Sequence, residues 1–172
     1  PSLEAMEGIQ RPSHFRGVTT IVSKLFLLTQ PHVAVFGEKD FQQAMIIRQM
    51  TRDLNFPIRI LLGATLREKD GLAMSSRNAY LTENQRGQAT VLYQMIQLAR
   101  KELRLNPQRK WTSSRLGSVT QKLLQATPLI RLDYMAFVDP HTLQQAKTIR
   151  KGIRMLLAAY AGKTRLIDNG SL

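Results

Sequence analysis

Hydrophobic residues recur every three or four positions in two segments of the first third of the chain, 18–28 and 41–54, which predicts two amphipathic helices. Two short apolar runs alternate with these segments, at 33–36 and 57–62, and each is followed by a glycine. Their length and their β-branched residues predict strands, the first of them a buried parallel strand. Helix, strand, helix and strand in succession are typical of parallel α/β construction.

The pattern changes in the second half of the chain. Thr82 precedes a long helical period over 86–103, and a second helix is predicted over 112–126. Three apolar runs with short connections follow, and they predict a short antiparallel sheet. These runs are 132–138, 153–161 and 164–167.

We therefore expect two domains, an α/β unit over 1–65 and an α+β unit over 66–172. The first holds seven Lys and Arg against five Asp and Glu, and the second holds eighteen against seven, a balance of +11. Such a balance indicates an anionic partner, namely nucleic acid, a membrane surface or a polyphosphate ligand. The basic residues are dispersed, with no cluster larger than a pair such as Arg150-Lys151, which favours an ordinary solvated surface over nucleic-acid binding.

The composition narrows the location of the protein. The absence of cysteine excludes disulfides and thiolate zinc sites and agrees with a cytoplasmic location. The longest apolar run, 155–161, is too short to cross a bilayer, so we expect no membrane partner. The chain begins at Pro1 without the pattern of a signal peptide, and we expect it to be a fragment or a processed piece of a longer chain.

The first stretch with candidate chemistry runs from Phe36 to Gln43, where a predicted strand ends at Gly37 and a helix begins at Asp40. In parallel α/β proteins this edge of the sheet binds ligands. Gly37 allows a close backbone approach, Lys39 offers a charge to phosphate, and Asp40 either caps the helix or accepts hydrogen bonds from ribose. A capping aspartate beside a solvated lysine also explains the stretch.

The second stretch is Met74-Ser75-Ser76-Arg77-Asn78, on a loop after the last predicted parallel strand. Two hydroxyls and a guanidinium side by side can bind phosphate oxygens through neutral and charge-assisted hydrogen bonds. An ordinary turn followed by a helix cap is the alternative. Because Gly71, Ala73 and the serines offer little apolar surface, we expect residues 67–78 to be mobile until phosphate binds.

Taken together, these motifs resemble the pantothenate synthetase family, the ATP-dependent pantoate–β-alanine ligases. The resemblance is carried by Arg11-Pro12-Ser13-His14-Phe15-Arg16-Gly17-Val18, Phe36-Gly37-Glu38-Lys39-Asp40-Phe41-Gln42-Gln43, Asp70-Gly71-Leu72-Ala73-Met74-Ser75-Ser76-Arg77-Asn78 and the closing Arg165-Leu166-Ile167-Asp168-Asn169. The serine–arginine stretch is similar to the KMSKS-type phosphate loop of the nucleotidylyltransferase superfamily. The resemblance implies part of a Rossmann-like (HUP-type) parallel sheet over 1–65 and, over 66–172, an α+β lid domain with a short antiparallel sheet.

The chain departs from that family's pattern in three ways. The family carries an HxGH motif whose two histidines bind the triphosphate, whereas His14, His32 and His141 are not paired. The family's chains are longer at the N-terminus, so we expect this chain to be the C-terminal part of the enzyme and to be inactive alone. Ala64 stands where the family usually has proline.

The resemblance implies an acyl-adenylate ligase. The carboxylate of pantoate would attack the α-phosphorus of ATP, accompanied by Mg²⁺, and β-alanine would then displace AMP; the full-length enzyme would be a homodimer. The residues implied are Lys39, Ser75, Ser76 and Arg77 as phosphate-binding and catalytic groups, Gly37 and Asp40 at ribose, Thr65, Leu66 and Met74 at adenine, Gln43, Ile21 and Val22 at pantoate, and Arg11 and His14 as neighbours of the substrates. The alternatives are a non-catalytic nucleotide-binding or structural module and a basic nucleic-acid-binding domain.

Overall fold

The computed structural model describes residues 6–11 and 13–172, and the chain forms two compact units. Unit 1 comprises the residues up to Thr65 together with the short segment His141–Gln144, and unit 2 comprises Leu66–Pro140 and Gln145–Leu172. Each unit has a hydrophobic core of its own. No helix of the described part of the chain is long and apolar enough to cross a membrane.

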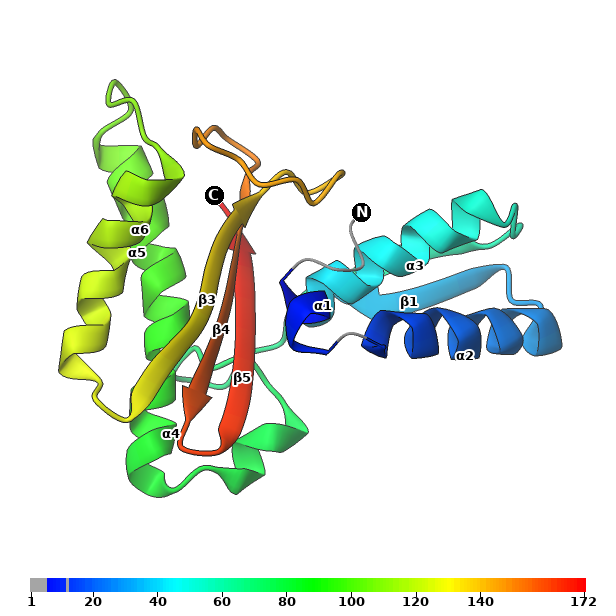
Figure 1. Cartoon of the computed structure of the whole chain (residues 1–172), viewed down its shortest axis with the longest axis horizontal. Coiled ribbons are helices and arrows are strands. Elements are labelled where there is room, and N and C mark those ends of the chain that lie inside the picture. Colours follow the sequence, from blue (N-terminus) through cyan, green and yellow to red (C-terminus); the bar gives the residue numbers. More distant parts are fainter. Residues whose placement is uncertain (1–5, 12) are drawn as a thin grey trace. The chain divides into compact units, whose positions relative to one another are not determined.

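Unit 1 combines helices with a two-stranded parallel sheet (Figure 1). Its elements are α1 (Glu7–Gln10), α2 (His14–Thr29), β1 (Val33–Gly37), the 3-10 helix η1 (Glu38–Asp40), α3 (Phe41–Asp53) and β2 (Arg59–Gly63). The two strands pair in parallel register, from Val33 opposite Arg59 to Gly37 opposite Gly63. The predicted order of helix, parallel strand, helix and parallel strand is therefore confirmed.

The core of unit 1 lies between α2, α3 and one face of the sheet. Ala34 and Phe36 of β1 pack there against Phe26 of α2, whose ring meets that of Phe36 edge to face at 6.4 Å between centroids. Val33 and Val35 are 45% and 67% exposed. The prediction of a buried strand is thus wrong for these alternate positions, because side chains of a strand point to opposite faces and the described helices cover the other face.

Unit 2 is an antiparallel sheet with helices packed against it (Figure 1). Its elements are η2 (Ser76–Tyr80, 3-10), α4 (Glu83–Ala89), α5 (Val91–Leu105), α6 (Ser113–Gln121), η3 (Lys122–Ala126, 3-10), β3 (Ile130–Val138), β4 (Arg154–Ala161) and β5 (Thr164–Ser171). The strand order is β3-β4-β5. This arrangement confirms the predicted α+β fold with a short antiparallel sheet.

The single long helix predicted over 86–103 is wrong, since α4 ends at Ala89 and α5 begins at Val91. The hydroxyl of Thr90 donates to the carbonyl of Gly87 at 3.0 Å, and such local bonds compete with the regular helical pattern. Thr82 forms a complete capping box at the start of α4. The second predicted helix is also divided, into α6 and η3.

The core of unit 2 fills the space between the helices and the sheet. Met95 of α5, Leu116 of α6 and Leu157 of the central strand β4 have no exposed surface. Leu72 belongs to the same core, although it comes from the segment that joins β2 to η2. That segment carries the second candidate motif, so its position is tied to the core of unit 2.

Candidate functional site

The carboxyl ends of β1 and β2 form one edge of the parallel pair in unit 1. Gly37 pairs with Gly63, the last residue of each strand. Lys39 and Asp40 follow in η1, and Thr65 follows β2, so these side chains start from the same edge. The structure thus brings together four residues that the sequence predicts for nucleotide binding, at the edge where parallel sheets bind ligands.

The backbone at this edge is open. A Cβ atom added at Gly37 would have no heavy atom within 4 Å, so no described side chain fills the space beside it. Asp40 is exposed and forms no side-chain hydrogen bond to the start of α3, so the interpretation of Asp40 as a helix cap is wrong. Its backbone, with φ −94° and ψ 56°, lacks the extended conformation of most capping residues.

The residues predicted around pantoate and the substrates lie on the helices of unit 1 or, for Arg11, directly after α1. Gln43 is in the first turn of α3 and is half-buried. Val22 of α2 packs against the core, whereas its neighbour Ile21 is 57% exposed and points elsewhere. Arg11 and His14 are close together, with Nη1 of Arg11 3.3 Å from Nε2 of His14. Because a guanidinium can only donate, this nitrogen of His14 is the acceptor.

The second motif belongs to unit 2 and follows a tight backbone turn. The N–H of Met74 donates to the carbonyl of Leu66 at 2.9 Å, and Arg67 and Ala73 form an isolated antiparallel bridge. The turn therefore brings Leu66 and Met74 side by side, with side chains 72% and 49% exposed. These are the two residues of unit 2 that the sequence predicts beside adenine.

The phosphate-binding residues that the sequence predicts in unit 2 lie at the start of η2. The hydroxyl oxygen of Ser75 accepts from the N–H of Arg77 at 3.3 Å and caps the helix. Ser76 and Arg77 are exposed, and Nη1 of Arg77 donates to the carbonyl of Arg165 on β5 at 3.2 Å. The hydroxyls and the guanidinium thus occupy neighbouring places on the surface of unit 2.

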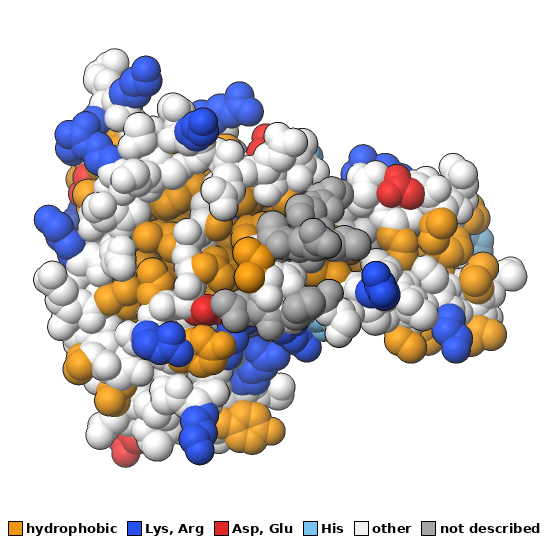
Figure 2. Space-filling view, in the orientation of Figure 1, with side chains coloured by type: hydrophobic (Ala, Val, Ile, Leu, Met, Phe, Trp, Pro, Cys, Tyr) orange, Lys and Arg blue, Asp and Glu red, His pale blue; other side chains and the backbone are white. Residues whose placement is uncertain are grey.

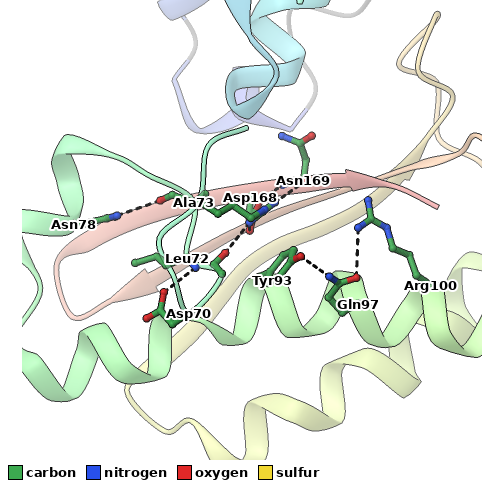
Figure 3. A network of polar contacts seen from close by, with 11 residues as sticks. Asp70, Leu72, Ala73, Asn78, Tyr93, Gln97, Arg100, Asp168 and Asn169 are labelled. Atoms are coloured by element: carbon green, nitrogen blue, oxygen red, sulfur yellow. Dashed lines mark hydrogen bonds and ion pairs between the residues drawn. The ribbon is translucent and has the colours of Figure 1, made fainter. Parts of the chain in front are cut away.

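The structure does not support the reasoning that residues 67–78 lack apolar anchorage. Leu72 and Ala73 are each 4% exposed. The side chain of Asn78 donates to the carbonyl of Ala73 at 3.1 Å, and the carboxylate of Asp70 accepts from the N–H of Leu72 (Figure 3). The expectation of a poorly anchored loop is wrong because one leucine at the tip of the turn reaches the core.

Residue Arg67 of this segment forms an ion pair that was not predicted from the sequence. Arg67 donates from both terminal nitrogens to the carboxylate of Asp168 on β5, at 2.7 and 2.8 Å. The partners are 101 residues apart in the chain, so no local pattern links them. The available signal was an aspartate and an asparagine directly after the apolar pair Leu166-Ile167, near the end of the chain.

The comparisons with known proteins agree with these motifs. The family model for pantoate-beta-alanine ligase matches residues 1–171. This chain belongs to the pantoate–β-alanine ligase family. A pantothenate synthetase of Pelodictyon phaeoclathratiforme is 46% identical over 171 residues, and one of Desulfatibacillum aliphaticivorans is 48% identical over 162 residues; the alignments cover 98% and 94% of this chain.

Solved structures of the family show the same fold. The pantothenate synthetase of Thermus thermophilus matches 97% of this chain with a TM-score of 0.90 and 41% identity. The ligase of Francisella tularensis, complexed with beta-gamma ATP and beta-alanine, matches 99% with a TM-score of 0.71 and 32% identity. The chain spans 59% and 56% of these two chains, and 59% and 57% of the curated relatives. Its position within the longer relatives stays a prediction.

Every aspartate of unit 2 is paired with an arginine. The pairs are Arg67–Asp168, Arg86–Asp70, Arg150–Asp139 and Arg165–Asp133. Figure 2 shows Lys and Arg side chains in several separate places on the visible face and not in one continuous block. This spread does not favour the nucleic-acid-binding alternative for this member of the ligase family.

The Asp70–Arg86 pair predicts a small dependence of stability on pH. The hydrogen bonds from Arg86 hold the pKa of the Asp70 carboxyl below its ordinary value, and Asp70 raises the pKa of Arg86. A carboxyl whose pKa is lower in the folded state stabilises the fold above its unfolded pKa, and this contribution is lost as the pH falls through the folded value. The contribution should therefore be present at pH 7, begin to fall below about pH 4 and be lost as the pH falls through the lower folded value.

The variant Asp70→Asn tests this dependence. The pair is partly exposed, with side chains 30% and 44% accessible, so the expected effect is small. Urea unfolding followed by the fluorescence of Trp111, the single tryptophan and a core residue of unit 2, should show D70N less stable than the unchanged protein at pH 7. The difference between the two proteins should be smaller at pH 3, about one unit below the ordinary carboxyl pKa, than at pH 7. A difference that is the same at both pH values would contradict the role of this carboxylate.

Proposed function

We propose that this chain is part of an enzyme that condenses pantoate with β-alanine to give pantothenate, in pantothenate and coenzyme A biosynthesis. ATP activates pantoate in this reaction, pantoyl adenylate is the intermediate, and pyrophosphate and AMP are released. The observation that carries the proposal is the pairing of Gly37 with Gly63, which gathers Lys39, Asp40 and Thr65 at one edge of the parallel sheet. Family membership supplies the reaction class.

In the first step, a carboxylate oxygen of pantoate bonds to the α-phosphorus of ATP, and the bond from this phosphorus to the bridging oxygen of pyrophosphate breaks. Negative charge accumulates on the phosphate oxygens. Lys39, with Arg77 and the hydroxyls of Ser75 and Ser76, would stabilise that charge through charge-assisted hydrogen bonds. The N-terminus of α3 beside Asp40 adds a favourable dipole for an anion.

In the second step, the amine of β-alanine forms a bond to the acyl carbon and AMP leaves with the electron pair of the broken bond. Neither step requires a covalent bond to the protein, so the side chains contribute by positioning and by charge. Gly37 and Asp40 would contact ribose, and Thr65, Leu66 and Met74 would border adenine. For pantoate, Gln43 would donate a hydrogen bond, with Ile21 and Val22 on its apolar side and Arg11 and His14 nearby.

ATP would enter as its magnesium complex. The described residues contain no group of three or more His, Cys, Asp or Glu side chains that could hold a metal ion. We propose that the magnesium ion is held mainly by phosphate oxygens and water and arrives with the substrate. We further propose a cytoplasmic location, in keeping with the absence of cysteine, and a homodimer for the complete enzyme.

Pantoate-dependent exchange of labelled pyrophosphate into ATP tests the proposed function, because it requires reversible formation of pantoyl adenylate. We expect no exchange by this chain alone, since its histidines form no HxGH pair, and exchange by the complete enzyme that contains it. Exchange by the chain alone would contradict the predicted inactivity of the fragment. A complete enzyme without pantoate-dependent exchange would refute the adenylate and favour a non-catalytic nucleotide-binding module.

A further inference from the structure

Both terminal nitrogens of the Arg67 guanidinium donate hydrogen bonds within unit 2. Its two terminal nitrogens donate to the two carboxylate oxygens of Asp168 at 2.7 and 2.8 Å. One of them also donates to the carbonyl of Gly71 at 3.0 Å. The side chains of Arg67 and Asp168 are only 19% and 3% exposed. The Arg67 side chain is therefore held by contacts within the protein itself.

An aromatic ring holds the same guanidinium from a second side. The central carbon of the Arg67 guanidinium lies 4.1 Å from the centroid of the Tyr93 ring, within the range of a cation–π contact. The amide of Gln97, one turn further along α5, donates to the hydroxyl of Tyr93 (Figure 3). The ring of Tyr93 fills the space beside Gly71, because a Cβ atom added at Gly71 would lie 2.3 Å from Cδ1 of Tyr93.

These contacts connect the phosphate motif to the sheet. Arg67 pairs across the turn with Ala73, the residue immediately before Met74 and the two serines. Asp168 belongs to β5. The guanidinium of Arg77 is attached to the same strand, through the carbonyl of Arg165. The motif is thus fixed to β5 at both ends, by Arg67 before the serines and by Arg77 after them.

We infer that Arg67 and Asp168 are positioning residues that hold Ser75, Ser76 and Arg77 in the arrangement that binds phosphate. Arg67 does not contact the phosphate in this arrangement, because Asp168 and Gly71 engage its terminal nitrogens and Tyr93 covers one face of the guanidinium. The phosphate part of this inference rests on the proposed function. A motif that is ordered before its ligand arrives binds more tightly, since binding does not have to order the loop.

The substitutions Arg67→Lys and Asp168→Asn separate this role from general stability. Lysine keeps the charge but loses the second parallel hydrogen bond and the stacking on Tyr93, so it should not replace arginine. Asparagine has nearly the shape of aspartate but no charge. Asp133→Asn is the matched control, because the Arg165–Asp133 pair of the same unit is similarly buried, with side chains 14% and 9% exposed. Arg165 contacts the motif through the backbone carbonyl that accepts from Arg77, and this substitution leaves that carbonyl in place.

Two measurements on each variant test the inference. Amide hydrogen exchange of residues 74–78 in the nucleotide-free chain should become at least about tenfold faster in R67K and D168N, as local opening becomes easier. It should change by less than about twofold in D133N. The affinity of the complete enzyme for ATP should fall by about tenfold or more in R67K and D168N, because ATP binding must then also order the loop. Its affinity for adenosine, which has no phosphate but would still contact Leu66 and Met74, should fall by less than its affinity for ATP.

Exchange at residues 74–78 that is unchanged in both R67K and D168N would overturn the inference. So would faster exchange with an unchanged affinity for ATP, since the pair would then be structural without a role in binding. The midpoint of urea unfolding, followed through Trp111, identifies any variant that has lost its fold, and D168N then stands in for R67K. An unchanged enzyme that binds no ATP would instead refute the proposed function, and the phosphate role of the pair would fall with it.

Discussion

Replacing Gly71 with alanine is expected to lower the free energy of unfolding of unit 2 by about 3 kcal/mol. The backbone of Gly71 has a φ of +94°, which costs a residue with a Cβ about 1–2 kcal/mol. The added methyl group would also lie 2.3 and 2.7 Å from two carbons of the Tyr93 ring, and a clash of this kind in a packed region costs about 1–3 kcal/mol. The ring cannot retreat freely because it packs against Arg67 and is hydrogen-bonded to Gln97.

Gly152→Ala is a matched control for this substitution. Gly152 is in the same unit and has nearly the same φ, +92°, but a Cβ there would have no heavy atom within 4 Å. Its substitution should therefore cost only the backbone strain, about 1–2 kcal/mol. Urea unfolding monitored at Trp111 compares the two variants. Equal losses of stability in G71A and G152A would show that the Tyr93 ring is not held against the turn.

The second large effect is expected at Lys39, in the complete enzyme that contains this chain. Lys39→Ala should lower the rate of adenylate formation by about 10²–10³-fold, the usual loss when one group that stabilises transition-state charge is removed. The fold should remain intact because Lys39 is half-exposed at the end of β1 and is not part of the core of unit 1. Single-turnover formation of pantoyl adenylate from bound ATP and pantoate measures this step directly.

Lys24→Ala controls for the loss of one positive charge in unit 1. Lys24 is an exposed residue of α2 that belongs to neither motif and is not one of the predicted site residues, and its removal should change the rate by less than about twofold at ordinary ionic strength. A single-turnover rate in K39A equal to that of K24A would assign Lys39 to the solvated surface of the protein.

The order of elements in unit 1 could be predicted from the sequence because each element has a clear hydrophobic period. The same reasoning failed for Val33 and Val35, since a run of four apolar residues does not show which face of a strand is covered. In unit 2, the last predicted strand ends at residue 167, whereas β5 continues through Asp168 and Asn169. Both are buried polar residues, so a search for apolar runs stops before them.

The candidate residues at the edge of the sheet could be predicted from local motifs, because a glycine that ends a strand and a cation that follows it are neighbours in sequence. The contacts that hold the second motif in place could not be predicted in this way. Arg67 and Asp168 meet only when the chain after β2 and the last strand come together. Likewise, a single leucine, Leu72, gave no periodic signal, yet its burial anchors the segment that composition alone suggested was loose.

The crystal structure of the complete enzyme with a non-hydrolysable ATP analogue and Mg²⁺ would test the central claim most directly. We expect phosphate oxygens within hydrogen-bond distance, about 3.2 Å or less, of the amine of Lys39, the hydroxyl of Ser76 and the guanidinium of Arg77. We also expect Arg67 to keep both of its hydrogen bonds to Asp168. A triphosphate bound away from both motifs, with Lys39 and Arg77 in solvent, would contradict the proposed site.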